Sequence, residues 1–264
     1  MFKHVHSFDV SYEEAKHIQN ELRKRIDSSD AISNIDEVER IGGVDVAFIN
    51  TVRKPSIEYN KKTNHAVFQN NIFPDTVSQK MSGRKKNIQA LAGVVIIDIK
   101  HGCVVETACA TAEVFFPYVP GYLTFREGPA VLAAIGELSV LPGVMMYDGC
   151  GIAHPRGCGL AAHMGIVTGI PSIGCAKSLL CGTCDEPGTS KGDWTDITYH
   201  NNVVGACLRT RDNVKPVYVS PGSGFSVDSA RELTLSLSWK YRLPEPTRLA
   251  HNLVTAEKKL YYNV

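Results

Sequence analysis

The 264-residue sequence lacks any apolar run long enough to cross a membrane, because nowhere do about 18 uncharged apolar residues stand together. Its first fourteen residues, MFKHVHSFDVSYEE, also lack the apolar stretch of a secretion signal. We therefore expect an intracellular protein, cytoplasmic or nuclear, without membrane contact. No internal repeat or linker divides the chain, and 44% hydrophobic content fits a sizeable buried core. These features favour a single domain over residues 1–264.

The sequence has almost no net charge. Its formal charge of +1 gives no general sign of a nucleic-acid partner, so any such sign must come from a local patch. Residues 51–90 form one, with eight Lys and Arg side chains and only two acids. We interpret the range 51–88 as a basic insertion, with a short hairpin at 65–68, whose phosphate contacts would add affinity regardless of base sequence.

A disulfide framework is not expected from the eight cysteines, because nothing in the sequence marks the chain for secretion. Cys181 and Cys184 have the two-residue gap of a zinc knuckle, and further Cys and His residues stand nearby at positions 150, 154, 158 and 163. The second Cys-x-x-Cys pair is missing. We therefore expect free thiols and keep structural zinc as an alternative.

Local patterns in the first half predict one helix and three strands. Ser11 and Glu14 have the spacing of a capping box, and apolar residues at helical spacing extend the predicted helix over 12–26. A strand of buried type follows at 41–49. Strands at 92–99 and 103–110, separated by Lys-His-Gly, are typical of a hairpin.

The second half predicts a β-α-β unit and further elements. A helix of about ten residues led by Pro129 precedes a strand at 144–147, a helix of small residues at 159–167 and a strand at 171–175. Strands at 203–208 and 217–219, a helix at 226–239, a turn at 243–246 and a final helix follow. Antiparallel strands followed by a β-α-β unit indicate an α/β fold with one mixed sheet flanked by helices.

Three acids stand out by their context: Asp45 inside a strand, Glu127 just ahead of a helix, and Asp148 at a strand end. Carboxylates gathered in a fold repel one another unless a cation lies among them, and Mg²⁺ prefers oxygen ligands. A magnesium site is one interpretation. The alternatives are that Glu127 is an acid favoured by a helix dipole and that Asp148 forms a turn before Gly149.

Five ordered segments resemble the endonuclease V family. They are GVDVAF at 43–48, PYVPG at 117–121 followed by FRE at 125–127, DGCGIAHPR at 148–156, PSIGCAK at 171–177 and YRLPEPTR at 241–248. Their order and gaps both match, from about residue 10 to 260 apart from the basic insertion. The resemblance implies a ribonuclease H-like fold and an endonuclease that cuts near hypoxanthine, at the second phosphodiester bond to its 3′ side.

The resemblance also implies roles for individual residues. Asp45, Glu127 and Asp148 would gather around Mg²⁺, with Mn²⁺ as a substitute, which fits the reading of these acids given above. His154 would lie beside the metal and assist the water or the phosphate, and Lys177 would hold a phosphate oxygen. The alternatives are a helix-start histidine and a surface lysine.

In this family the loop 117–121 looks like a wedge. Tyr118 would stack where a base has left the helix, and Pro117 and Pro120 would stiffen the loop, which is otherwise an ordinary rigid turn with an aromatic lid. The displaced hypoxanthine would enter a pocket in which glycines let the backbone approach the base between apolar walls. The residues expected to line it are Gly121, Leu123, Gly149, Gly151 and Leu180.

Two positions depart from the family pattern. Members commonly have Gly-His-Arg where this chain has Ser223 after Gly222, and the polar residue that often follows Asp-Gly is Cys150 here. Contacts made through those side chains would be lost or altered, and Asp228 is a candidate to serve near the metal instead.

The resemblance leaves two other functions open: a non-cleaving inosine-binding module, and a related nuclease with another substrate. The expected partner is DNA or single-stranded RNA that contains inosine, and the choice between them stays open. No obligate protein partner is evident.

Overall fold

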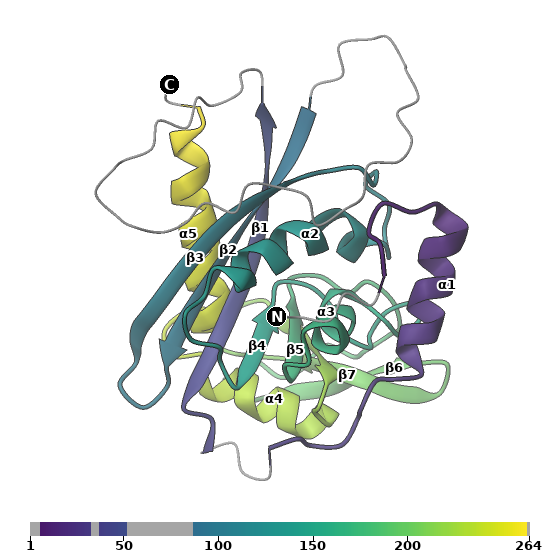
Figure 1. Ribbon diagram of the computed structural model, residues 1–264. Coiled ribbons are helices and arrows are strands. Elements are labelled where there is room, and N and C mark those ends of the chain that lie inside the picture. The colour runs from purple at the N-terminus through teal and green to yellow at the C-terminus, as the bar shows by residue number, and fades with distance from the viewer. Residues whose placement is uncertain (1–5, 33–36, 52–86, 263–264) are drawn as a thin grey trace.

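The computed structural model describes residues 6–32, 37–51 and 87–262, and the structural statements below concern these ranges. Within them, eight strands form one mixed sheet in the order β3-β2-β1-β4-β5-β8-β7-β6 (Figure 1). The predicted α/β fold with a mixed sheet flanked by helices is confirmed. The predicted hairpin at 65–68 and almost all of the basic insertion lie outside the described residues.

The first three strands form an antiparallel meander. β1 (Arg40–Thr51) pairs with β2 (Asn87–Asp98) along its whole length, and β2 pairs with β3 (Cys103–Glu113). The turn between β2 and β3 contains Gly102 at φ +63°, a left-handed conformation that favours glycine. The predicted hairpin is therefore confirmed.

The β-α-β unit is also confirmed. β4 (Val144–Tyr147) pairs in parallel with β1, and β5 (Ser172–Ala176) pairs in parallel with β4 after the crossover through α3 (Leu160–Thr168). The carboxyl ends of three neighbouring parallel strands consequently lie at one edge of the sheet, where open α/β folds bind their ligands.

One strand of the far edge was missed by the sequence patterns. β6 (Trp194–Tyr199) pairs with β7 (Asn202–Leu208), which pairs with β8 (Val217–Ser223). A signal was present, since every residue of β6 except Asp196 is aromatic or β-branched. Its turn residues His200 and Asn201 have φ of 50° and 61°. Two consecutive residues with positive φ are typical of a tight hairpin turn.

Three of the predicted helices differ in their bounds by several residues, and one of them, predicted over 226–239, is found over Val227–Ser236. α1 (Tyr12–Arg23) has the predicted capping box but ends three residues early. α2 (Leu123–Gly136) begins six residues before Pro129, which therefore lies inside the helix. The proline removes one backbone hydrogen bond, but the helix buries most of its first eight residues against the sheet and against α1, and this packing outweighs that loss. Glu127 is accordingly a residue within α2, and the prediction that it precedes a helix was wrong.

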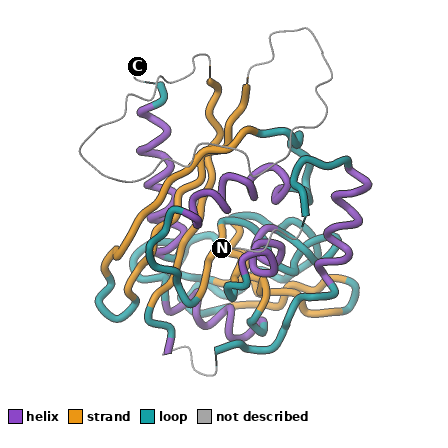
Figure 2. Tube along the Cα trace, in the orientation of Figure 1, coloured by secondary structure: helices purple, strands orange, loops and turns teal. Residues whose placement is uncertain are grey.

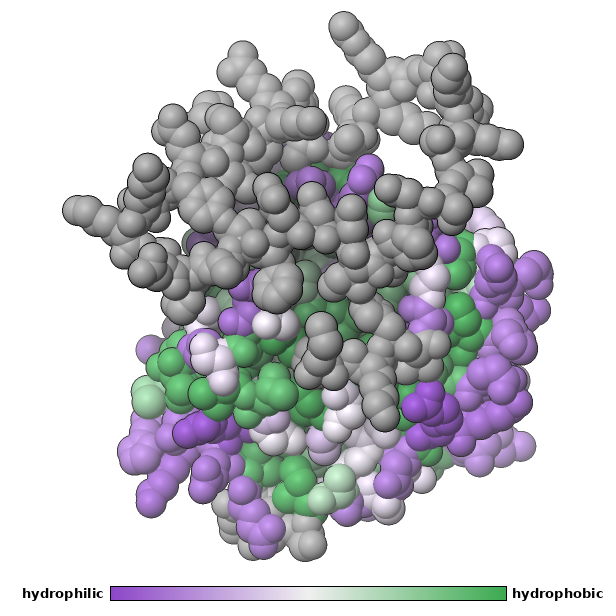
Figure 3. Space-filling view, viewed as in Figure 1, coloured by the Kyte–Doolittle hydropathy of each residue, from purple (hydrophilic) through white to green (hydrophobic). Residues whose placement is uncertain are grey.

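The helices form two layers around the sheet (Figures 1 and 2). α2 and α3 pack on one face, and α4 (Val227–Ser236) and α5 (Glu245–Leu260) pack on the other. α1 lies beside α3, and Figure 3 shows hydrophilic side chains gathered over its outer side. Among the described helices, none combines the length and the apolar character needed to span a membrane.

Candidate active site

Asp45 and Asp148 are neighbours on adjacent parallel strands. The last register pair of β1 and β4 is Val44 with Tyr147, and the backbone N–H of Asp148 donates to the Val44 carbonyl at 3.2 Å. The next residue along each strand is an aspartate, and neighbouring strands lie about 4.8 Å apart. Residues in register point to the same face of a sheet, so the topology brings these two predicted acids together.

Helix α5 adds a histidine to this pair. His251 Nδ1 lies 2.7 Å from Asp45 Oδ2, although 206 positions separate the two residues in the chain. The close approach of α5 depends on glycines in the sheet, because a Cβ on Gly43 would lie 2.0 Å from the Pro246 carbonyl oxygen and one on Gly93 would lie 2.6 Å from Val254. Small residues under α5 thus position His251.

Glu127 comes to the acids from α2, on the opposite face of the sheet. Glu127 is only 8% exposed. Burial and, after it, the charges of Asp45 and Asp148 raise the pKa of its carboxyl, which is about 8 although Arg126 opposes the rise. Because the charges of both aspartates act on Glu127, the structure brings all three predicted acids into one electrostatic cluster.

Lys177 follows β5 directly and donates a hydrogen bond to Asp148 Oδ2. Burial raises the pKa of Asp148, and the charge of Asp45 adds to this effect, while the bond from Lys177 opposes it. Burial lowers the pKa of Lys177, but the bond to Asp148 together with the charges of Asp148 and Asp45 outweighs burial, and the net change is a rise. The lysine therefore stays charged and compensates one of the three carboxylates.

The donor chemistry of this cluster fits a hard divalent cation. All three acids offer oxygen, and the raised pKa values of Glu127 and Asp148 show how poorly negative charge is tolerated there. In the described part of the chain, no three Asp, Glu, His or Cys side chains already stand together as metal ligands. Lys177 and His251 pair with two of the acids instead, so cation binding is expected to compete with these two pairs.

A cavity of about 100 Å³ opens at the start of α2, the helix that carries Glu127. Five predicted residues line it, and they come from the loop 117–121, called the wedge loop below, from the start of α2 and from the segment after β5. They are Tyr118, Pro120, Gly121, Leu123 and Leu180. The other lining residues were not predicted for the pocket: Gln19, Val119, Thr124, Cys150, His154, Gly159 and Leu160. The loop after Asp148 thus contributes to the cavity through Cys150.

Three predicted residues do not line the cavity. Pro117 lies at the outer end of the wedge loop. Gly151 packs against β8, since a Cβ there would lie 1.9 Å from the Pro221 carbonyl oxygen, and a Cβ on Gly149 would meet Leu160. These two glycines allow close packing behind the cavity wall. Asp228, the candidate to serve near the metal, pairs with Arg231 rather than with the acidic cluster. Its side chain is 73% exposed at the start of α4.

A single backbone carbonyl holds the wedge loop in place. Gly121 has φ +82°, and its oxygen accepts hydrogen bonds from Gln19 Nε2 at 3.0 Å, His154 Nε2 at 2.8 Å and Arg156 Nη2 at 2.5 Å. Gln19 also accepts from Arg156 Nε at 2.6 Å, so the three side chains brace one another. A Cβ on Gly121 would lie 2.9 Å from Arg156 Nη2, which would have to shift, and the positive φ strains any residue other than glycine.

His154 takes part in this network through both ring nitrogens. Its Nδ1 accepts from the backbone N–H of Arg156 at 3.1 Å, so the proton is on Nε2 and is donated to Gly121. Burial lowers the pKa of His154 to about 4, and the ring is neutral at neutral pH. The hydrogen bonds of His154 therefore go to the wedge loop and its own loop rather than to the carboxylates.

The cysteines are free thiols, as predicted. The residues of the alternative zinc site do not gather: His163 Nε2 lies 2.6 Å from His6 Nε2, and His154 is bonded to backbone groups. Since the described residues contain no three-ligand group of Cys and His, structural zinc is not supported.

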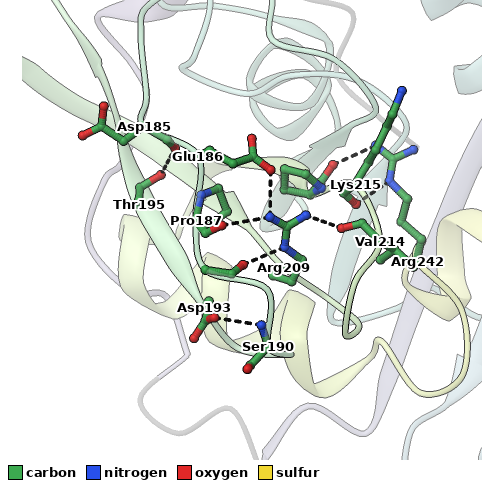
Figure 4. A network of polar contacts seen from close by, with 12 residues as sticks. Asp185, Glu186, Pro187, Ser190, Asp193, Thr195, Arg209, Val214, Lys215 and Arg242 are labelled. Atoms are coloured by element: carbon green, nitrogen blue, oxygen red, sulfur yellow. Dashed lines mark hydrogen bonds and ion pairs between the residues drawn. The ribbon is translucent and has the colours of Figure 1, made fainter.

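The buried guanidinium of Arg209 binds two loops together near the end of the sheet that carries β6 and β7 (Figure 4). Arg209 is 6% exposed and donates to Glu186 Oε1 at 2.7 Å, to the carbonyls of Pro187 and Gly188 at 2.8 Å each, and to the Val214 carbonyl. A buried charge is tolerated when its donors are satisfied in this way. The network holds the segment that leads into β8.

Arg242 bonds to this segment (Figure 4) and also to the backbone of Lys177, next to the acidic cluster. Its guanidinium donates to the carbonyls of Lys215 at 2.9 Å, Pro216 at 2.7 Å and Lys177 at 3.1 Å. The last of these bonds fixes the backbone of the lysine that reaches Asp148. Arg242 is thus placed to position Lys177.

Several of these residues carried no predicted role. Gln19 stands beside the apolar stripe of α1, and a buried polar residue at a core position is the signal that marks it. Arg156 and Arg242 lie inside the matched motifs. His251 lies three residues beyond the last motif, one turn further along α5.

Comparison with known proteins finds similarity to Endonuclease V in both sequence and structure. The sequence model of the family described as Endonuclease V matches residues 75–252. An Endonuclease V from Dictyoglomus thermophilum is 36% identical over 255 residues, which cover 97% of this chain and 93% of that protein. The structure of Endonuclease_V from Bacillus subtilis is similar with a TM-score of 0.82 at 28% identity, covering 99% of this chain and 98% of the other.

Similar structures include some that were solved with nucleic acid. One of them is Ciona intestinalis Endonuclease V in complex with a 24mer DNA containing an inosine followed by a ribo-adenosine. Its TM-score is 0.69 at 25% identity, and the match covers 94% of this chain and 97% of the other. These similarities agree with the ribonuclease H-like class expected from the motifs.

Proposed function

The chain belongs to the endonuclease V family, and from that premise we propose that it uses Mg²⁺ to cut one nucleic-acid strand at the second phosphodiester bond 3′ to a hypoxanthine base. Membership makes it a nuclease, a hydrolase of phosphodiester bonds. The inosine-containing DNA bound by the Ciona relative supports hypoxanthine as the recognised base.

The observation that carries the proposal is the position of the cavity relative to the acids. Thr124 lines the cavity and Glu127 belongs to the acidic cluster, and the two residues are three positions apart on α2. Side chains at this spacing lie on the same helix face, about 5 to 6 Å apart at Cβ. A nucleotide whose base occupies the cavity would therefore place its backbone near the carboxylates.

The acidic cluster supplies the groups for hydrolysis. Asp45, Glu127 and Asp148 would hold Mg²⁺, for which Mn²⁺ would substitute, and the ion would stabilise charge on the scissile phosphate and activate water. Lys177, which bonds Asp148 here, would turn to a phosphate oxygen. Attack of water on phosphorus breaks the bond to the 3′ oxygen and leaves 3′-hydroxyl and 5′-phosphate ends.

The wedge loop would hold the strand while the base is displaced. Tyr118 is 70% exposed at the cavity mouth, where its ring is free to stack in the gap. His154 would act by fixing Gly121, because both of its ring nitrogens are already bonded to backbone groups. We also propose that residues 1–264 act as one nuclease domain, because Asp45 lies in one strand of the sheet, Asp148 directly follows the neighbouring strand, and Glu127 comes from a helix packed on that sheet.

A nicking assay tests the proposal. Labelled DNA and RNA strands with one inosine are compared with strands that have guanosine at the same position, in Mg²⁺, in Mn²⁺ and in EDTA. We expect one nick at the second bond 3′ to inosine, only with metal. The matched variant Asp148→Asn should bind the inosine strands without cutting them. Binding without any cleavage by the native protein would instead favour an inosine-binding module.

A further inference from the structure

Thr124 is the second residue of α2 and lines the cavity. It is 1% exposed, and among the described residues its hydroxyl oxygen has no hydrogen-bond partner. A threonine in a helix often bonds the carbonyl four residues before it, which here belongs to Pro120, yet that bond is not made. The hydroxyl is therefore buried at the cavity and uncommitted.

The other buried polar side chains around the cavity are engaged, while Tyr118, which also lines it, is exposed. Both N–H groups of the Gln19 amide donate, to Gly121 and to Cys158, and its oxygen accepts from Arg156. His154 uses both ring nitrogens. The thiol of Cys150 is a weak donor at best. Among the buried side chains of the lining, Thr124 thus holds the strong donor that remains for a ligand.

A buried hydroxyl without a partner is disfavoured, and such groups in native proteins usually have a reason at a functional site. The cavity combines apolar walls from Leu123, Leu160 and Leu180 with this one polar group. Apolar walls with a few convergent polar groups are typical of pockets for flat ligands such as displaced bases. The unpartnered hydroxyl is explained if a base completes its hydrogen bonding.

We propose that the Thr124 hydroxyl donates a hydrogen bond to the 6-oxo oxygen of the purine in this cavity, which favours a 6-oxo purine over a purine without this oxygen. The inference rests on the proposed function, in which hypoxanthine enters the cavity. Deamination places a carbonyl acceptor where adenine has an amino donor. An enzyme that selects deaminated purines must read that atom, and a hydroxyl is able to donate to it.

Binding of four strands in EDTA tests this contact separately from cleavage. The strands differ at one nucleotide, which is inosine, adenosine, guanosine or nebularine, a purine nucleoside without the 6-oxo group. The native protein is compared with Thr124→Val, which keeps the shape and removes the hydroxyl, and with Thr124→Ser, which keeps the hydroxyl. Thr124→Ala provides a second hydroxyl-free variant if valine disturbs folding, which thermal unfolding reports.

We expect the hydroxyl-free variants to bind the inosine strand roughly ten-fold more weakly, as the loss of one hydrogen bond implies. The nebularine strand should bind equally weakly to native and variant proteins, and Thr124→Ser should resemble the native protein. Equal losses on inosine and nebularine, or no loss on inosine, would overturn the role of Thr124. A native protein without preference for inosine over adenosine and guanosine would instead overturn the proposed function itself.

Discussion

Removing the charge of Glu127 should stabilise the metal-free protein in a manner that depends on pH. Burial and the two neighbouring aspartates raise the pKa of this carboxyl from 4.5 to about 8. Between these values the folded protein keeps a proton that the unfolded chain has released. The free energy of unfolding therefore falls as pH rises through this window, and below pH 4.5 both states are protonated and the effect is absent.

The size of the effect follows from the two pKa values. Each pH unit between them corresponds to about 1.4 kcal/mol, so at pH 8 and above the native protein should be less stable than Glu127→Gln by at most about 5 kcal/mol. Glutamine keeps the shape of the protonated acid and does not titrate. Asp148 is present in both proteins, so its own titration largely cancels from the difference.

Urea unfolding in EDTA at pH 5, 6, 7, 8 and 9 measures this difference directly. The two proteins should be nearly equal at pH 5, and the variant should unfold at higher urea as pH rises. Added Mg²⁺ should narrow the gap at pH 8 by stabilising the native protein alone. A difference that does not change with pH, or a native protein more stable than the variant at pH 8 in EDTA, would refute the reasoning.

Three further predictions concern the wedge loop and the lysine. Gly121→Ala forces a side chain into a left-handed conformation 2.9 Å from a guanidinium nitrogen, so it should lower stability by about 1 to 3 kcal/mol in thermal or urea unfolding and weaken binding of inosine strands. Arg242→Gln should loosen the backbone of Lys177 and reduce single-turnover cleavage by roughly ten-fold, with binding in EDTA unchanged; an equal loss in binding would contradict a positioning role. Tyr118→Ala should bind inosine strands roughly ten-fold more weakly because base stacking is lost, whereas Tyr118→Phe should bind almost normally, and equal effects of the two changes in a filter-binding titration would disprove the wedge.

Local patterns determined most of the elements. The capping box at Ser11 and Glu14, the hairpin around Gly102 and the β-α-β unit before and after α3 all act over a few residues, where side-chain spacing and backbone preference decide the outcome. The same patterns misplaced the start of α2. Pro129 is favourable in the first turn of a helix, and only packing against α1 and the sheet shows that the helix begins earlier.

The acids were identifiable from sequence because a carboxylate in an apolar strand needs a reason. The sequence alone did not determine which side chains pair with these acids. His251 reaches Asp45 across 206 positions, and Lys177 is bonded to Asp148 rather than free for a ligand. These pairs depend on how closely α5 and β5 approach β1 and β4, a distance that glycines in the sheet permit but that no local pattern encodes.

The same division holds for the cavity. The wedge loop and its glycine were visible in the sequence, as were the leucines on either side. Only the folded arrangement shows that Gln19 braces Gly121 across 102 positions and that Thr124 has an uncommitted hydroxyl. Hydrogen-bond satisfaction in a buried site is a property of all the groups that meet there, so it is decided by tertiary packing and not by any one segment.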